Sequence, residues 1–158
     1  MSKKRLSQTK KNIVFLGHMG SGKSTIGRGL SKKLGLDFYD TDKEIEKEMG
    51  QKIAKIFDES GESIFRNIER KITLKLLDKK NSIIALGGGG FEDLKIRKLI
   101  LNKCNSIWLK CDLNILEKRC RVSKKRPLLS NKNIKAEFER LNKIRQKNYS
   151  KAKFTIDV

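Results

Sequence analysis

Residues 17–25 constrain the fold of this chain more than any other segment. They run Gly-His-Met-Gly-Ser-Gly-Lys-Ser-Thr, which matches the phosphate-binding loop pattern of glycine, four variable residues, glycine, lysine and serine or threonine. An apolar run at 12–16 predicts a buried strand before the loop, and apolar residues at helical spacing over 26–34 predict a helix after it. The motif therefore has the strand, loop and helix order that nucleotide binding requires.

The loop glycines let the backbone aim successive N–H groups at a polyphosphate, and the positive end of the following helix adds to that field. Lys23 is predicted to reach the β- and γ-phosphates, and the Ser24 hydroxyl is predicted to ligate Mg²⁺. The ATP-binding residues predicted within the loop are Gly20, Ser21, Gly22, Lys23, Ser24 and Thr25.

Length and composition set the class of protein. A chain of 158 residues suits one domain that holds both substrates. No apolar run approaches the roughly 18 residues of a membrane span, so we expect a soluble, cytoplasmic protein without a membrane partner. The three cysteines fit neither a zinc nor a disulfide pattern, and the single histidine, His18, excludes histidine triads and multi-histidine metal sites.

The formal net charge of +20 favours anionic partners. The lysines are spread along the chain and do not form one block interleaved with aromatic residues, as single-stranded nucleic-acid binding would favour. We therefore expect a solvated basic surface that attracts anionic small molecules. Residues 1–11 are predicted to form a flexible basic tail before a single domain over 12–158.

Strand and helix patterns alternate along the rest of the chain, which predicts an α/β fold with a parallel sheet and right-handed crossovers. Strands are predicted at 37–39, 82–86, 106–109 and 154–158, and helices at 42–49, 53–57, 62–77 and 134–149. Asp112 is a predicted N-cap for a helix that follows it. Residues 121–130 lack periodicity and are predicted to form a mobile lid that carries Arg126 to the transferring phosphoryl group.

Two carboxylates follow the second predicted strand, at Asp40 and Asp42. The strand at 82–86 ends in four glycines and offers no acid for Mg²⁺. Because residues two apart on an extended segment point the same way, Asp40 is predicted to face Mg²⁺ and Asp42 the acceptor hydroxyl, whose proton it takes. The alternative is that Asp42 only caps the helix that follows.

Two arginines are candidates for binding an anionic acceptor. Arg66 has Glu69 three residues later, a helical spacing that braces the guanidinium, and Arg145 supplies a second guanidinium for a carboxylate clamp. Each could instead form a surface ion pair. The glycines at 87–90 follow a strand and would let backbone N–H groups approach a ligand, although such a run also suits a tight turn.

Taken in order, these motifs resemble the shikimate kinase family over nearly the whole chain. The matching segments are 17–25, 40–42, 56–57, 61–62, 65–66 with Glu69, 86–89, 126–129, and Arg145 with Tyr149. The resemblance implies a three-layer fold like that of nucleoside monophosphate kinases, with a five-stranded parallel sheet in the order 2-3-1-4-5. It also implies transfer of the ATP γ-phosphate to the 3-hydroxyl of shikimate, with Mg²⁺.

The resemblance also implies roles for individual residues. Asp42 would contact the ring hydroxyls and act as the base, while Arg66 and Arg145 would bind the shikimate carboxylate. Ser24 and Asp40 would hold Mg²⁺. The remaining implied positions are Gly87, Gly88 and Gly89 along the ring, Phe57 and Phe65 on its apolar side, Lys23 and Arg126 at the phosphoryl group, and Arg119, or else Arg121, beside adenine.

One departure from the family stands out, because the chain stops at Val158, where the family usually continues into an adenine-contacting loop and a closing helix. We expect an incomplete adenine pocket on that ground. Three alternatives remain open at this point: another small-molecule or nucleotide kinase on the same fold, a non-catalytic nucleic-acid-binding protein, and a truncated inactive homologue. The kinase reading predicts a monomer without an obligatory protein partner.

Overall fold

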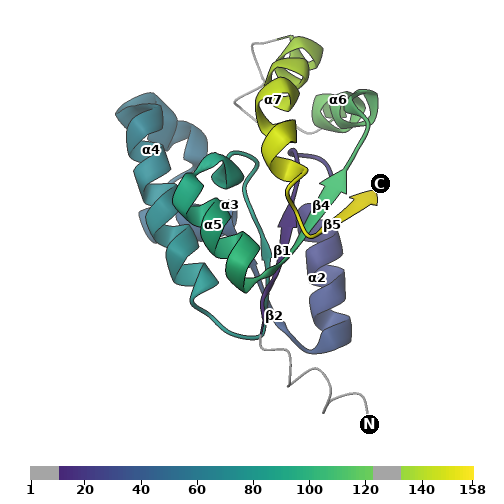
Figure 1. Ribbon diagram of the computed structural model, residues 1–158. Helices are drawn as coiled ribbons and strands as arrows, with labels where there is room; N and C mark the ends of the chain where they lie inside the picture. Colours follow the sequence, from purple (N-terminus) through teal and green to yellow (C-terminus); the bar gives the residue numbers. More distant parts are fainter. Residues whose placement is uncertain (1–10, 123–132) are drawn as a thin grey trace.

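The computed structural model describes residues 11–122 and 133–158. Its strands form one parallel sheet in the order β2-β3-β1-β4-β5, which confirms the predicted order (Figure 1). The strands are β1 (Ile13–Leu16), β2 (Asp37–Asp40), β3 (Ser82–Ala85), β4 (Asn105–Lys110) and β5 (Phe154–Asp157). Because all of them run the same way, their carboxyl ends and the loops that follow lie at one edge of the sheet.

Helices cover both faces of the sheet and make three layers. They are α2 (Lys23–Leu34), α3 (Thr41–Met49), α4 (Ile53–Leu77), the 3-10 turn η1 (Gly90–Glu92), α5 (Leu94–Lys103), α6 (Leu113–Val122) and α7 (Ile134–Tyr149). Alternate strand residues face opposite layers. Phe15 and Ile83 pack toward Leu30 of α2, whereas Val14 and Ile84 pack with residues of α4, α5 and α7.

Several helix boundaries differ from those predicted from the sequence. Helix α2 begins at Lys23, three residues before the predicted start, because the end of the phosphate loop is already its first turn. The helices predicted at 53–57 and 62–77 join as α4, which kinks at Gly61 (φ 83°, ψ 171°), the predicted break. Arg121 and Val122 close α6 and do not belong to an irregular segment.

Helix α5 was not predicted at all. Its N-cap Asp93 accepts hydrogen bonds from the backbone N–H groups of Lys95 and Ile96, so an aspartate of the type that commonly begins helices marks its start. Asp112 does cap α6 as predicted, by accepting a hydrogen bond from the backbone N–H of Asn114 (2.8 Å).

The lid over 121–130, with Arg126, lies mostly outside the described residues, as do ten residues of the predicted tail. Among the helices of the described residues, none combines the length and apolar character needed to cross a bilayer.

Candidate active site

The phosphate loop follows β1 and leads into the first turn of α2. Gly17 has φ 143°, and a Cβ there would lie 2.8 Å from the Leu109 carbonyl oxygen, so no larger residue fits. Lys23 Nζ donates to the carbonyl oxygens of Gly17 (2.7 Å) and His18 (2.9 Å). Its ammonium group is thereby held across the loop. Ser24 and Thr25 lie beside it in the first turn of α2.

His18 anchors the loop to α7, a role that the sequence did not reveal. Its ring is buried edge-on against Phe138 (6.0 Å) and Tyr149 (5.4 Å), and its Nε2 lies 3.2 Å from Asn142 Oδ1. Burial lowers the pKa of His18 to about 4, with smaller contributions from Arg145 and Lys23, so the imidazole is neutral at physiological pH. The loop and α7 are thus packed as one unit.

Asp40 is the N-cap of α3, and this corrects the alternative in which Asp42 caps that helix. The Asp40 carboxylate accepts hydrogen bonds from the backbone N–H groups of Asp42 (3.0 Å) and Lys43 (3.3 Å). Its other oxygen accepts from the Ser24 hydroxyl. Asp42 lies inside α3, so the two carboxylates do not follow one extended segment as predicted. Asp42 is therefore not the N-cap.

Asp42 lies against the glycine run that follows β3. Its Oδ1 is 2.6 Å from the position that a Cβ would occupy at Gly87, and the Gly87 N–H donates to Thr41 Oγ1 (2.8 Å). Burial raises the pKa of Asp42 to about 6, and the carboxylates of Asp40 and Glu69 add to the shift, while Lys23 opposes it. Asp42 thus lies within the electrostatic reach of both the phosphate loop and α4.

The next two glycines meet the two predicted arginines. A Cβ at Gly88 would lie 2.9 Å from Arg145 Nη1, and one at Gly89 would lie 2.6 Å from Arg66 Nη1. The Gly88 carbonyl also accepts a hydrogen bond from the Tyr149 hydroxyl (2.5 Å). The glycine run is therefore more than a tight turn, because it lets two guanidinium groups lie against the backbone.

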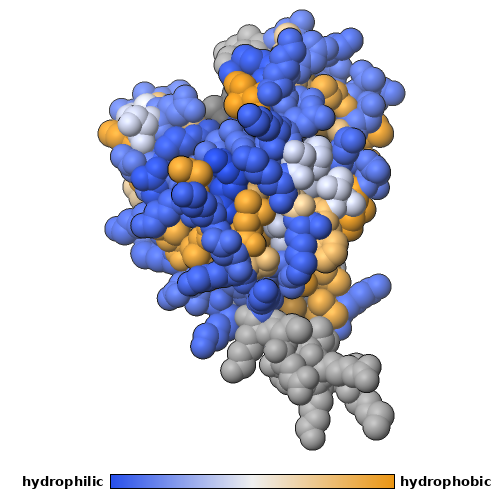
Figure 2. Space-filling view, in the orientation of Figure 1, coloured by the Kyte–Doolittle hydropathy of each residue, from blue (hydrophilic) through white to orange (hydrophobic). Residues whose placement is uncertain are grey.

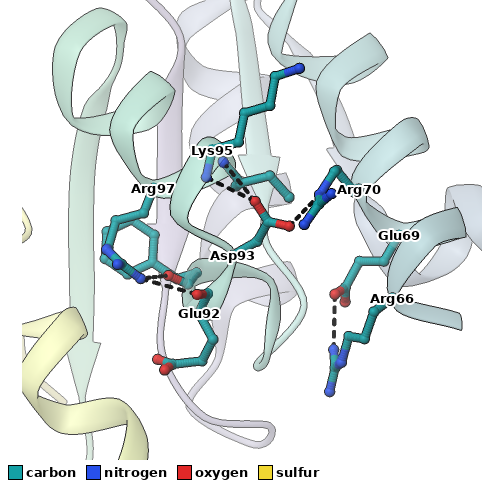
Figure 3. A network of polar contacts seen from close by, with 9 residues as sticks. Arg66, Glu69, Arg70, Glu92, Asp93, Lys95 and Arg97 are labelled. Carbon is teal, nitrogen blue, oxygen red and sulfur yellow. Dashed lines mark hydrogen bonds and ion pairs between the residues drawn. The ribbon is translucent and has the colours of Figure 1, made fainter. Parts of the chain in front are cut away.

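Arg66 is braced as predicted (Figure 3). Its Nη1 donates to Glu69 Oε1 (2.8 Å). Its Nη2 lies 3.6 Å from Glu62 Oε1. Glu69 is 3 % exposed, and its burial raises its pKa although Arg66 opposes the shift. On the same face of α4, Arg70 binds Asp93 (2.5 Å), which ties α4 to the start of α5.

A cleft of about 560 Å³ opens beside these groups. It is lined by Met19, Phe57, Glu62, Arg66, Glu69, Gly89, Glu92, Asp93, Glu137, Arg140, Leu141, Ile144 and Arg145. Met19 belongs to the phosphate loop, so the cleft extends from the loop to α4, η1 and α7. Sequence reasoning missed the contribution of α7 other than Arg145 and Tyr149, because its cleft-facing side chains form no motif.

The two predicted phenylalanines differ in position. The Phe57 ring lines the cleft, and Phe65 is buried with its ring 4.5 Å from that of Phe57. The Arg66 guanidinium lies 5.3 Å from the centre of the Phe65 ring. Phe65 therefore supports the apolar wall and does not form its surface.

Of the two arginines predicted beside adenine, only Arg119 reaches the phosphate loop. Its Nη1 donates to the Gly20 carbonyl (2.8 Å). Arg121 pairs with Glu117 on its own helix. Arg126, predicted at the phosphoryl group, lies outside the described residues.

The family model and the similar proteins that match this chain all point to one family. The shikimate kinase family model matches residues 19–158. A shikimate kinase of Zymomonas mobilis is 41% identical over 142 residues, which are 90% of this chain and 81% of that protein. One of Persephonella marina is 45% identical over 137 residues, covering 85% and 83%.

Comparison with solved structures points to the same family. A shikimate kinase from Acinetobacter baumannii, determined in complex with shikimate, superposes with a TM-score of 0.93 at 34% identity, covering 99% of this chain and 87% of that one. A gluconokinase from Sinorhizobium meliloti reaches a TM-score of 0.51 at 15% identity, with 95% and 83% covered, and shows a common fold alone.

Proposed function

The chain belongs to the shikimate kinase family and is an ATP-dependent kinase, and on that premise we propose how its residues transfer the γ-phosphate of ATP to the 3-hydroxyl of shikimate. One observation supports the proposal most strongly. The backbone of the glycine run lies against Asp42, Arg145 and Arg66 at three successive residues, beside a cleft that begins at the phosphate loop.

An acceptor with a carboxylate and an apolar side needs cationic donors and an apolar wall, and the cleft offers both. Arg66 and Arg145 approach the glycine backbone from α4 and α7, so a carboxylate placed between them receives two charged donors. Glu69 holds Arg66 in place, and Tyr149 holds the Gly88 carbonyl. Phe57 supplies the apolar wall.

Asp42 acts as the general base in this proposal. It accepts a hydrogen bond from the acceptor hydroxyl, whose oxygen then attacks the γ-phosphorus in line with the leaving ADP oxygen. A new P–O bond forms as the bond to the β-phosphate oxygen breaks, and the hydroxyl proton passes to the carboxylate. Lys23, already directed across the loop, balances the charge of the transferring group.

The oxygen donors of Ser24 and Asp40 fit Mg²⁺. They come from the first turn of α2 and the end of β2 and lie within hydrogen-bonding distance of each other beside the phosphate loop. Mg²⁺ favours such hard oxygen ligands together with phosphate oxygens and water. When bound, the ion neutralises phosphate charge. Arg119, which reaches the loop at Gly20, is placed on the nucleotide side of the site.

The test is acceptor-dependent release of ADP by the purified chain with ATP and Mg²⁺. Shikimate, gluconate, nucleoside monophosphates and no acceptor are compared in parallel. Of these acceptors, we expect only shikimate to support turnover. Asp42→Asn should lower the shikimate-dependent turnover by about 10²- to 10⁴-fold, the range of general base catalysis. Asp58→Asn, which changes an exposed carboxylate on α4, is the matched control. Turnover with gluconate but not shikimate would contradict the assignment of the acceptor.

A further inference from the structure

Helix α7 turns one stripe of side chains toward the phosphate loop. Four of its residues are spaced three or four apart, so they share one face of the helix: Phe138, Asn142, Arg145 and Tyr149. The surface over α7 is largely hydrophilic in Figure 2, whereas three of these four residues are buried. The fourth, Asn142, is partly buried and meets His18 of the loop. A hydrogen bond therefore joins α7 to the loop within a mostly buried stripe.

The hydrogen bonds of Asn142 define how it meets His18. Asn142 Nδ2 donates to Gln146 Oε1 (3.1 Å), which leaves Asn142 Oδ1 to accept. His18 Nε2 lies 3.2 Å from that oxygen, so the imidazole carries its proton on Nε2 and donates it to Asn142. Because burial lowers the pKa of His18 to about 4, Nδ1 carries no proton at neutral pH.

The other ring nitrogen makes this one bond important. His18 is 4 % exposed, and its Nδ1 has no hydrogen-bond partner among the described residues. The edge-on contacts with Phe138 and Tyr149 constrain the plane of the ring but add no polar contact to it. Within the described part of the chain, Asn142 is therefore the polar contact that fixes where the ring lies along α7.

On the nucleotide side, His18 acts through its backbone. Its carbonyl oxygen accepts hydrogen bonds from Lys23 Nζ (2.9 Å) and from the N–H of Ser21 (3.2 Å). Neither bond involves the imidazole. A substitution of the His18 side chain therefore keeps these bonds of the phosphate loop and changes the contact with α7.

Farther along the stripe, α7 reaches the glycine run after β3. Arg145 Nη1 lies 2.9 Å from the position that a Cβ would occupy at Gly88, and the Tyr149 hydroxyl donates to the Gly88 carbonyl (2.5 Å). Arg145 follows Asn142 by about one helical turn. Because a helix is stiff over one turn, a shift of α7 at Asn142 also moves the Arg145 guanidinium.

We propose that His18 and Asn142 form a positioning pair, which fixes α7 against the phosphate loop and so sets the separation between Arg145 and the bound nucleotide. An acceptor held by Arg145 is thereby kept in reach of the γ-phosphate. The cleft-lining residues include neither His18 nor Asn142, so the pair acts through Arg145 and not by contact with substrate. This inference rests on the proposed function for the role of Arg145.

The first experiment is NMR of the untagged chain, in which His18 is the single histidine and its ring signals are assigned without ambiguity. Nitrogen chemical shifts distinguish the two neutral tautomers. We expect the Nε2–H form in the wild type and a changed Nε2 signal in Asn142→Leu, because its acceptor is lost. A wild-type Nδ1–H form, or a signal that Asn142→Leu leaves unchanged, would overturn the pair. No substrate is present, so this result does not depend on the acceptor.

The second experiment is a double-mutant cycle. His18→Leu and Asn142→Leu each leave one partner unpaired, whereas the double variant removes both polar groups. We expect each single variant to lower kcat/KM for shikimate by about three- to tenfold, and the double variant to return to within about threefold of wild type. The Kd for ADP, measured without shikimate, should stay within about twofold throughout.

Two further variants separate the hydrogen bond from packing alone. His18→Gln keeps an amide N–H near the place of Nε2, so kcat/KM for shikimate should stay within about threefold of wild type. Lys143→Leu changes an exposed side chain next to Asn142 in α7 and should alter neither kcat/KM nor the Kd for ADP. Melting temperatures show which variants are folded in the assay, and His18→Gln and the double variant carry the test if a single variant unfolds.

The alternatives give different patterns. A purely structural pair would lower melting temperatures and leave kcat/KM for shikimate unchanged in the folded variants. Support of the phosphate loop alone would weaken ADP binding as much as it lowers kcat/KM. Either pattern, or losses that add in the double variant, would overturn the proposal. A wild-type chain without shikimate-dependent turnover would instead contradict the proposed function, and the cycle would then be measured with the acceptor that the chain does use.

Discussion

At the scale of single residues, Asp42 combines a functional role with a cost in stability. Its pKa is raised from 3.8 to about 6, so its charged form is disfavoured in the folded protein. The folded state therefore loses stability as pH rises from 3.8 through 6, by up to about 3 kcal/mol. We expect Asp42→Asn to raise the free energy of unfolding above pH 6 while it lowers turnover by about 10²- to 10⁴-fold.

Urea denaturation of both proteins between pH 6 and 3.8 measures this gain, which should shrink as pH falls. The exposed Asp58→Asn should change stability by no more than about 0.5 kcal/mol. An Asp42→Asn protein that is less stable than wild type at neutral pH would show that the carboxylate makes favourable contacts outweighing its burial.

Arg66 and Arg70 offer a matched pair one turn apart on α4. Arg66 lies against Gly89 and lines the cleft, whereas Arg70 is outside it and binds Asp93. Lysine keeps the charge but not the planar pair of donors. Arg66→Lys should raise the KM for shikimate by roughly ten- to a hundredfold, as expected for a lost charged hydrogen bond, with the KM for ATP unchanged.

Arg70→Lys should leave both KM values within about twofold. Steady-state kinetics with each substrate varied in turn decides the matter. If both variants raise the KM for shikimate equally, α4 acts through its overall position and the Arg66 guanidinium has no individual part in recognition.

At the scale of elements, α2 contains two glycines with opposite roles. A Cβ at Gly27 would lie 2.7 Å from the Phe38 ring, whereas one at Gly29 would meet nothing within 4 Å. Gly27→Ala should destabilise the protein by about 1–3 kcal/mol, because the partly buried Phe38 ring, which is packed against the core, has to move. Gly29→Ala should stabilise it by about 0.5–1 kcal/mol, the usual helix preference of alanine.

Thermal unfolding of the two variants measures both effects, and the kinase activity of Gly29→Ala should match that of wild type. The two shifts in melting temperature need not be equal in size, but they must have opposite signs. A stabilised Gly27→Ala protein would mean that α2 can move away from the sheet without loss, contrary to the close packing of the helix on β2.

Sequence patterns predicted the elements that local rules specify. The phosphate loop, the strands and α7 follow from periodicity and glycine placement, and their order was enough to predict the sheet. Asp40 was misjudged as a partner of Asp42 on one extended segment, because the helix begins one residue earlier than predicted and its cap is Asp40. Helix boundaries depend on which side chain captures the first N–H groups, which periodicity does not reveal.

The predicted acceptor residues did come together, but their supports could not be predicted. Arg66, Arg145 and Gly87 to Gly89 were identified from chemistry and resemblance, and each lies at the same glycine run. The packing of His18 on α7 and the bond from Tyr149 to Gly88 join segments more than 60 residues apart. Such contacts depend on the tertiary fold, and no spacing in the sequence encodes them.

At the scale of the whole molecule, the charge of the surface and that of the cleft differ in sign. The chain carries +20, yet the cleft is lined by five carboxylates and three guanidinium groups. Glu69 and Glu137 brace Arg66 and Arg140, so these acids orient the arginines and offset their field. Long-range attraction of anions therefore arises from the lysines spread over the surface.

This separation predicts unequal salt dependence for the two substrates. Attraction by a distributed surface scales with the charge of the ligand, and ATP carries several negative charges where shikimate carries one. As the Debye length shrinks from about 30 to about 8 Å, kcat/KM for ATP should fall by up to about tenfold, and that for shikimate by much less. Kinetics at constant free Mg²⁺ measure both slopes, with sucrose as the uncharged control. Equal slopes would contradict long-range attraction by the distributed surface charge, because that attraction scales with the charge of the ligand.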